Sequence, residues 1–221
     1  MTHEEIIKAL FEQTLVGNAP AVLELTQQGL DEGMTPSAIL YEALIPSLEE
    51  VGARFERGDY FVPEMLIAGK AMSGALNLLR PLLAETGAET VGTYVMGTVK
   101  GDVHDIGKNL VNIMLEGAGF KVIDLGVQTA PEKFIAAIIE HQPDIVGMSA
   151  FLTTTMPMFK VNIHEITKAG LRDKVIIMVG GAPVTQEYAD VVGADGFAAD
   201  ASTAVRVAKD LIQKKRVLLN A

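Results

Sequence analysis

One short segment of the sequence concentrates the side chains that can do chemistry. It reads Gly101-Asp102-Val103-His104-Asp105-Ile106-Gly107-Lys108 and holds two glycines, one imidazole and two carboxylates. Asp102 and His104 occupy alternate positions, so we expect their side chains to point the same way and to hydrogen-bond each other. A carboxylate that accepts the proton of one imidazole nitrogen leaves the other nitrogen free as a more basic ligand. One protein ligand of this kind is enough for a metal only if a macrocycle supplies the other four.

A phosphate-binding loop is a competing interpretation of this segment. Gly101, Gly107 and Lys108 approach the pattern G-x4-G-K-[ST]. However, five residues separate the two glycines instead of four, and Asn109 stands where the pattern needs a hydroxyl to reach magnesium. The segment does not fit a phosphate-binding loop.

A hydrolytic metal site and simple helix capping also compete for this segment. A hydrolytic site on His104 and Asp105 needs more ligands, but the remaining histidines lie at the amino terminus or in segments expected to be helical. Capping of the next helix by Asp102 and His104, with Gly107 packed against the preceding strand, would explain each residue alone. It does not explain why the carboxylate and the imidazole stand two positions apart.

The composition narrows the classes of function. The chain has 221 residues, of which 49% are hydrophobic, and this is ample for one or two packed domains. The absence of cysteine excludes disulfides, thiolate zinc sites, iron–sulfur clusters and cysteine nucleophiles. A net charge of −10 argues against nucleic acid as a partner. Because there is neither an apolar run of about 20 residues nor a signal peptide, we expect no membrane association and a cytoplasmic location.

Residues 1–88 predict a helical domain. Thr2 and Glu5 form a capping-box signature before the first helix. Three more helices are expected to begin near Pro20, Pro36 and Pro63, and four amphipathic helices with short connections predict an antiparallel bundle. The small and polar stretch 84–90 is the expected linker to the next domain.

Residues 89–221 predict an α/β domain with a parallel five-stranded sheet of flavodoxin or Rossmann type and helices on both faces. The expected strands are 91–99, 121–125, 145–149, 175–179 and 196–198, and the expected helices are 107–118, 131–141, 156–169, 183–192 and 202–215. If the strand order is 2-1-3-4-5, the segment 101–108 and the segment 150–155 border one crevice at the carboxyl edge of the sheet.

The spacing of three separate motifs gives a resemblance. Asp102-x-His104-x-x-Gly107, then 41 residues, Ser149-x-Phe151, then 28 residues, and Gly180-Gly181 is similar to the split signature D-x-H-x-x-G, S-x-L and G-G of cobalamin-binding domains. The helical bundle resembles the cap domain of the same group, so the likeness covers nearly the whole chain. The chain resembles the corrinoid protein of anaerobic methyltransferase systems, and its binding module is similar to that of cobalamin-dependent methionine synthase.

The resemblance implies cobalamin or a related corrinoid as the cofactor. His104 would be the lower axial ligand of cobalt, Asp102 would hold His104, and Thr155 would stand behind Asp102. The nucleotide tail of the cofactor would run past Ser149, Phe151, Thr153, Gly180 and Gly181. Gly107 would let the next helix start close beneath the corrin ring, and Asp105 and Lys108 would be solvated or would contact the tail. The cap residues Phe61, Met65 and Leu66 would cover the upper face of the ring.

Two departures from the pattern bear on these assignments. Phe151 stands where the pattern has leucine, which affects the shape of the tail pocket. Thr155 stands where methionine synthases have serine, which keeps the hydroxyl.

The function that the resemblance implies is methyl carriage. Cobalt(I) would take a methyl group from a substrate:corrinoid methyltransferase, and a second methyltransferase would pass it to tetrahydrofolate or coenzyme M, with a reductive activation protein as a further partner. Two different functions compete with this one, an adenosylcobalamin- or light-sensing regulator and a mutase small subunit. The sequence does not identify the methyl donor, which could be an aryl methyl ether, methanol, a methylamine or a betaine.

Overall fold

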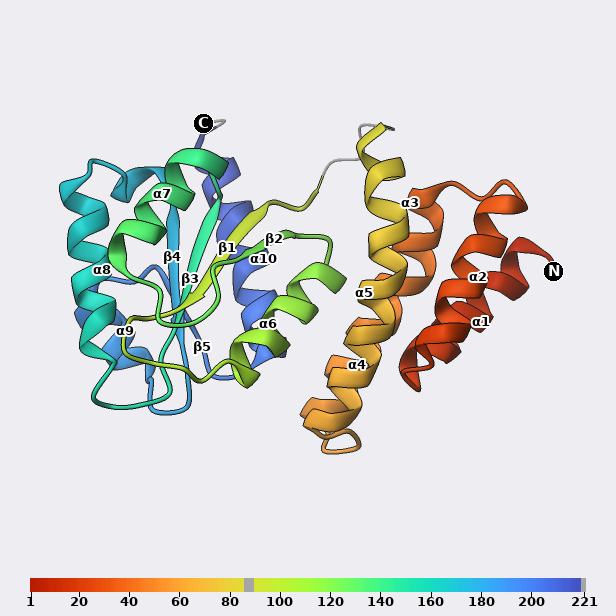
Figure 1. The fold of residues 1–221 in the computed structure, drawn as a ribbon, viewed down its shortest axis with the longest axis horizontal. Helices are drawn as coiled ribbons and strands as arrows, with labels where there is room; N and C mark the ends of the chain where they lie inside the picture. The colour runs from red at the N-terminus through yellow and green to blue at the C-terminus, as the bar shows by residue number, and fades with distance from the viewer. Residues whose placement is uncertain (86–89, 220–221) are drawn as a thin grey trace. The chain divides into compact units, whose positions relative to one another are not determined.

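The computed structural model describes residues 1–85 and 90–219. Two compact units make up the chain, one of Met1–Glu89 and Glu116–Gly119 and the other of Thr90–Leu115 and Phe120–Ala221. In Figure 1 the first is coloured from red to yellow and the second from yellow-green to blue. The domain limits 1–88 and 89–221 stay a prediction, and the expected linker, 84–90, lies mostly outside the described residues. Within the described ranges, no helix is long and apolar enough to cross a membrane.

The first unit is a bundle of helices. α1 (His3–Leu15) begins at the predicted capping box, in which the backbone N–H of Glu5 donates to Thr2 Oγ1 and the backbone N–H of Thr2 donates to Glu5 Oε2. α2 (Ala19–Asp31) packs against α1 and against α5 (Val62–Glu85), while α1 also contacts α4 (Ile45–Glu56). The predicted helices are therefore present, and their apolar faces form the buried interior of the unit.

The third predicted helix contains an irregular turn. α3 (Pro36–Ala38) leads into η1, a π-helical segment at Ile39–Leu44, and then into α4. Pro46 follows this segment, and a proline inside a helix collides with the carbonyl group four residues before it. A wider turn relieves that collision, and the Ser47 hydroxyl donates to the Leu44 carbonyl at 2.7 Å. Apolar periodicity predicted the helix but not its wider turn.

The second unit contains the predicted parallel sheet. Its strands are β1 (Thr93–Thr98), β2 (Lys121–Asp124), β3 (Ile145–Ser149), β4 (Ile176–Gly180) and β5 (Gly196–Ala198). They pair in parallel in the order β2-β1-β3-β4-β5, which confirms the order considered from the sequence. β2 is added on one side of β1, and β3, β4 and β5 are added on the other side, so the strand order switches between β1 and β3. Ligands of such sheets bind at this switch point.

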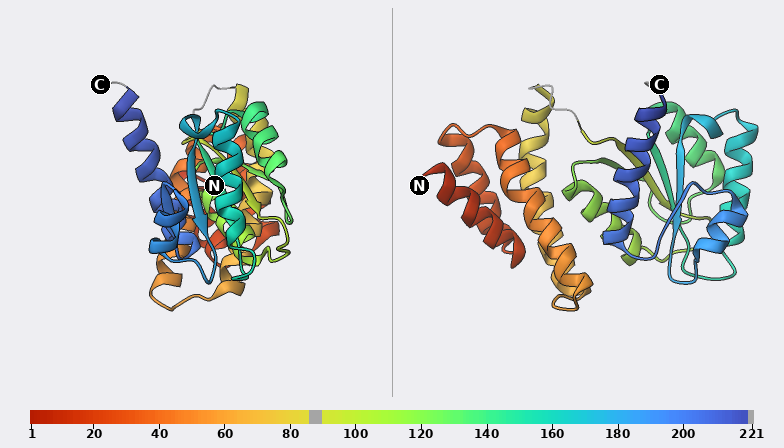
Figure 2. Two further views of the ribbon diagram at one scale, coloured as in Figure 1. Left: turned by 90° about the vertical axis from the view of Figure 1, so that its left-hand side faces the viewer. Right: turned by 180° about the vertical axis from the view of Figure 1, so that it is seen from behind.

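Helices cover both faces of the sheet (Figures 1 and 2). They are α6 (Ile106–Gly117), α7 (Pro131–His141), α8 (Pro157–Lys168), α9 (Gln186–Val192) and α10 (Ala201–Leu219), with a short 3-10 turn, η2 (Arg172–Lys174). Phe134 of α7 and Phe159 of α8 are buried in one core with Val95 and Ile177 of the sheet. α10 packs against β4 and β5 on the opposite face, which it shares with α6.

The carboxyl edge of the sheet brings distant segments together. Thr98, Ser149, Gly180 and Ala198 end four neighbouring strands and lie in register. The loop after β4 lies against the loop after β3. A Cβ on Gly181, whose φ is +135°, would lie 1.9 Å from the carbonyl oxygen of Ala150. The close approach of these two loops therefore requires glycine at 181.

We expect Gly181→Ala to lower the free energy of unfolding by more than about 2 kcal/mol, because the added carbon meets rigid backbone at a φ that L-residues avoid. Urea unfolding of the cofactor-free protein measures the change. Gly107→Ala is the matched control, since a Cβ at Gly107 meets no atom within 4 Å. Equal losses in the two variants would contradict the steric explanation.

Candidate functional site

The loop from β1 to α6 is held at both ends by hydrogen bonds. The backbone N–H of Asp102 donates to the Val99 carbonyl at 3.1 Å, and Gly101 supplies the positive φ of +86° that this tight turn requires. Further along, the Thr98 hydroxyl donates to the His104 carbonyl at 3.1 Å. The loop therefore fixes the backbone on either side of the Asp102 side chain.

Asp102 and His104 make the contact expected from their alternate positions. Asp102 is fully buried, and its Oδ1 lies 2.7 Å from His104 Nδ1 and 3.0 Å from the His104 backbone nitrogen. Because an ionised carboxylate only accepts hydrogen bonds, we assign the ring proton to Nδ1, which leaves a lone pair on Nε2. The imidazole is thus oriented by one nitrogen and available for ligation through the other.

The loop from β3 to α8 supplies the other donors to this carboxylate. The backbone N–H groups of Phe151 and Leu152 donate to Asp102 Oδ2 at 2.8 and 3.2 Å. The Thr155 hydroxyl, expected behind Asp102, lies 2.7 Å from the same oxygen. β1 and β3 are neighbours in the sheet, so their loops meet at this carboxylate although about fifty residues separate them in the sequence.

These contacts set the charge state of Asp102. Burial alone would raise the pKa of its carboxyl group, because burial disfavours the charged form. The backbone and ring N–H groups of His104, the Thr155 hydroxyl and the Phe151 N–H outweigh that effect and hold the pKa well below its usual range. Asp102 is therefore a buried anion, and its charge acts on the imidazole beside it.

The His104 side chain is partly exposed, and one of its ring nitrogens is unengaged among the described residues. The side chain is 43% exposed, and Nε2 has no hydrogen-bond partner in the part of the chain that the structure describes. The Phe151 ring stacks on the imidazole, with the ring centroids 4.4 Å apart and the planes inclined by 28°. Val103, Ile106 and Leu152 are exposed on the same two loops or at the adjoining start of α6. No three histidine or acidic side chains gather into a metal-binding group among the described residues.

The other candidates on the loops of this unit differ in exposure. Asp105, Gly107 and Thr153 are exposed, and a Cβ on Gly107 would point into open space. That finding contradicts the capping interpretation in which Gly107 packs the helix against the strand. Ser149 is half-buried, and its hydroxyl lies 2.9 Å from the Thr98 hydroxyl.

Gly180 and Gly181, at the end of β4 and just after it, are required by packing within the protein. A Cβ on Gly180 would lie 3.0 Å from the Ala198 carbonyl oxygen, and one on Gly181 would clash with Ala150. Packing within the protein therefore explains both glycines without a ligand. Their contact with a nucleotide tail stays a prediction.

The three cap candidates lie in the helical unit at the start of α5. Phe61 is 65% exposed, Leu66 is half-buried, and Met65 is buried at 1% exposure. Of these three residues, Phe61 therefore has the side chain most accessible to a ligand. The role of these residues in covering a cofactor stays a prediction.

Sequence reasoning misjudged Lys108 and missed Thr98. Lys108 was expected to be solvated or to contact the tail, but its side chain is 1% exposed and its Nζ lies 2.6 Å from Asp124 Oδ2. Burial is tolerated because the opposite charge offsets the cost of removing the ammonium group from water. Lys108, Asn112 and Leu115 repeat at helical spacing and are all buried, and this spacing is the sequence signal that could have predicted the burial of Lys108.

No comparable sequence signal marked Thr98, whose hydroxyl connects the His104 carbonyl with Ser149.

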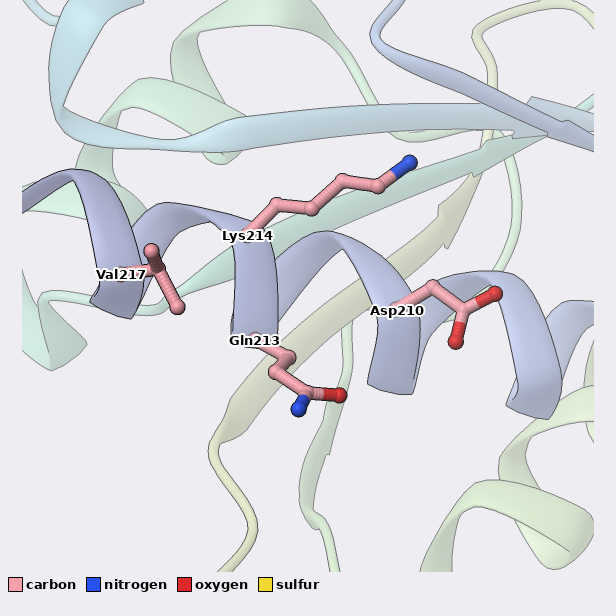
Figure 3. A pocket seen from close by; sticks show the side chains of 4 residues that line it. All are labelled: Asp210, Gln213, Lys214 and Val217. Atoms are coloured by element: carbon pink, nitrogen blue, oxygen red, sulfur yellow. The ribbon is translucent and has the colours of Figure 1, made fainter.

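A pocket on α10 lies apart from this site. Asp210, Gln213, Lys214 and Val217 line it, as Figure 3 shows. α10 runs back from the carboxyl edge, and near its end Arg216 donates to the Val91 carbonyl just before β1. The pocket therefore lies toward the amino edge of the sheet, and none of the candidate residues lines it.

Comparisons with known proteins agree with the motifs. A family model described as a B12 binding domain matches residues 92–208, and a second model with the same description matches residues 6–80. Dimethylamine corrinoid protein 1 of Methanosarcina acetivorans is 40% identical over 213 residues, which are 96% of this chain and 100% of that protein. A corrinoid protein of Desulfitobacterium hafniense is 38% identical over 212 residues, covering 95% of this chain and 98% of the relative.

A solved structure is also similar along almost the whole chain. It belongs to the methanol:cobalamin methyltransferase complex of Methanosarcina barkeri and superposes with a TM-score of 0.83 at 28% sequence identity. The match covers 95% of this chain and 80% of that one. The similarity therefore includes both the helical unit and the α/β unit.

We expect Asp102→Asn to lower the free energy of unfolding by about 2 kcal/mol at neutral pH, because an amide cannot accept all the hydrogen bonds that the carboxylate accepts. The depressed pKa makes this contribution fully present above the unfolded-state pKa of about 4 and lost as the pH falls through the lower folded-state pKa. The difference in the free energy of unfolding between wild type and Asp102→Asn should therefore become smaller below about pH 4. Urea unfolding at several pH values measures it.

Asp105→Asn is the control for this prediction, since Asp105 is exposed and its replacement should change stability by less than about 0.5 kcal/mol. A stability difference between wild type and Asp102→Asn that stays constant from neutral to acidic pH would contradict the assignment of a buried anion.

Proposed function

Because this chain belongs to the family of B12-binding corrinoid proteins and binds cobalamin or a related corrinoid, we propose that it carries methyl groups between two methyltransferases. The observation that carries the proposal is the His104 ring, whose Nδ1 is bonded to the buried Asp102 carboxylate while Nε2 is unengaged within the described structure. This arrangement suits a single axial ligand and does not supply a complete metal site.

The residues at the carboxyl edge of the sheet fit a flat macrocycle. A corrinoid brings four ring nitrogens to its cobalt, so that His104 Nε2 would complete the lower side. The exposed side chains of Val103 and Ile106 offer apolar contact for the ring, and the open space at Gly107 leaves room beside it. When bound, the corrinoid supplies a cobalt atom that takes up and releases a methyl group.

The protein would contribute the orientation of the axial ligand. Asp102 holds the imidazole by Nδ1, and Thr155 and two backbone N–H groups hold Asp102 in turn. Nε2 would thereby be presented to cobalt in a fixed orientation.

The proposed partners are methyltransferases. One would be a substrate:corrinoid methyltransferase, and the other would pass the methyl group to tetrahydrofolate or coenzyme M; a reductive activation protein would restore the active cofactor. The similar solved chain comes from a methyltransferase complex, which supports a partner of this class. The cytoplasmic location expected from the sequence is part of the proposal. No observation favours a sensory regulator or a mutase subunit.

We expect the holoprotein, incubated without oxygen with its cognate methyltransferase, to acquire a methylated cofactor from one methyl donor. Dimethylamine is the first donor to test because a relative at 40% identity is named for it, and methanol, an aryl methyl ether and a betaine follow. The visible spectrum of the cofactor measures methylation. Failure with every donor, together with bound adenosylcobalamin, would favour the regulator or the mutase subunit instead.

We expect His104→Ala to retain bound corrinoid but to show the visible spectrum of a cofactor without a lower imidazole ligand. The change follows from the loss of Nε2, while the other contacts with the corrinoid remain. His164→Ala is the matched control, since His164 lies exposed on α8 and should leave the spectrum unchanged. A wild-type spectrum in His104→Ala rules out ligation by this residue.

A further inference from the structure

Phe151 contacts the Asp102–His104 pair in two ways. Its backbone N–H donates to Asp102 Oδ2 at 2.8 Å. Its ring stacks on the imidazole at 4.4 Å between centroids, with the planes 28° apart. One residue of the loop after β3 therefore holds both the carboxylate and the imidazole of the loop after β1.

The two contacts constrain different motions of the His104 side chain. The hydrogen bond from Nδ1 to Asp102 fixes where one edge of the ring lies, but it allows the ring plane to tilt about that bond. A parallel aromatic neighbour favours one orientation of the plane, since offset stacking is the preferred geometry of such pairs. The side chain of His104 is 43% exposed, so part of the ring is open to solvent. Together the contacts direct Nε2 away from Asp102 in a defined orientation.

The side chain of Phe151 is the part that an aliphatic residue would not replace. The backbone N–H is available from any residue except proline, and Leu152 makes the same kind of bond to Asp102 at 3.2 Å without stacking on the imidazole. A leucine at position 151 would keep the hydrogen bond but would offer no flat π surface. In the structure the Phe151 ring stacks on His104, and its contact with a nucleotide tail stays a prediction.

We propose that Phe151 is a positioning residue that holds the His104 imidazole in the orientation for axial ligation. The inference rests on the proposed function, because it assumes that His104 Nε2 binds cobalt. When Nε2 is not a ligand, the ring stays stacked on Phe151 and bonded to Asp102. Nε2 would then bind cobalt again without a change of the His104 rotamer. Phe151 thereby shifts the equilibrium toward the imidazole-bound cofactor.

We expect Phe151→Leu to shift the equilibrium between imidazole-bound and imidazole-free corrinoid toward the free form by roughly two- to tenfold, the range that an aromatic pair accounts for. Phe151→Tyr keeps a stacking ring and should restore the wild-type equilibrium. Thr154→Ala alters an exposed side chain of the same loop, outside the stack and the hydrogen bonds to Asp102, and should leave the equilibrium unchanged. The visible spectrum of the holoprotein at one fixed pH measures the bound fraction.

A second measurement uses the protein without cofactor. The Phe151 ring current should shift the carbon-bound ring protons of His104 in NMR spectra, and Phe151→Leu should remove that shift while Phe151→Tyr keeps it. The chain has four histidines, so His104→Ala identifies the signals by their loss. Phe151→Met, which has a side chain of similar size without a ring, serves in both measurements if Phe151→Leu does not fold.

The outcomes separate this inference from the proposed function. If His104→Ala changes the spectrum but Phe151→Leu changes neither the bound fraction nor the proton shifts, the positioning role is wrong and axial ligation stands. If His104→Ala leaves the spectrum unchanged, axial ligation is wrong and the inference falls with it. A shifted bound fraction in Phe151→Leu, restored in Phe151→Tyr and absent in Thr154→Ala, supports the proposal.

Discussion

The buried carboxylate of Asp102 is the constraint on which the site depends. A charge removed from water is tolerated only when donors surround it, and here the donors come from two loops. His104 contributes its ring and its backbone from the same loop, while Phe151, Leu152 and Thr155 contribute from the loop after β3. The sheet makes this possible, because β1 and β3 are adjacent and end in register at Thr98 and Ser149. Satisfying one anion thus joins two loops and orients the imidazole between them.

The imidazole then has two nitrogens in different surroundings. Nδ1 is bonded to a buried anion, whereas Nε2 has no hydrogen-bond partner among the described residues, and the side chain is partly exposed. A chain without cysteine and without a described cluster of metal ligands can still bind cobalt when the cofactor brings most of the ligands. The protein's share of the chemistry is then the orientation of one side chain, while substrate choice belongs to the proposed partner enzymes.

Glycines at the carboxyl edge serve different purposes, and the structure distinguishes them. Gly101 supplies a positive φ to a turn, and Gly181 allows the backbone of one loop to approach another. Gly107 has open space where its side chain would lie, so no packing within the described structure demands glycine there. The first two are needed to build the site. At Gly107 no contact within the described structure requires a small residue, and a ligand in that space, such as the proposed corrinoid, would account for the glycine.

The sequence by itself determined the types and order of the elements, because apolar periodicity and turn residues are local properties of the chain. It also determined the Asp102–His104 pair, since two positions in one loop fix which side chains can meet. Only the tertiary structure decided the π turn before Pro46, the burial of Lys108 against Asp124 and the stacking of Phe151 on His104. The last two contacts join residues that strand order and side-chain rotamers bring together, and the sequence encodes them only through the packing of the whole sheet.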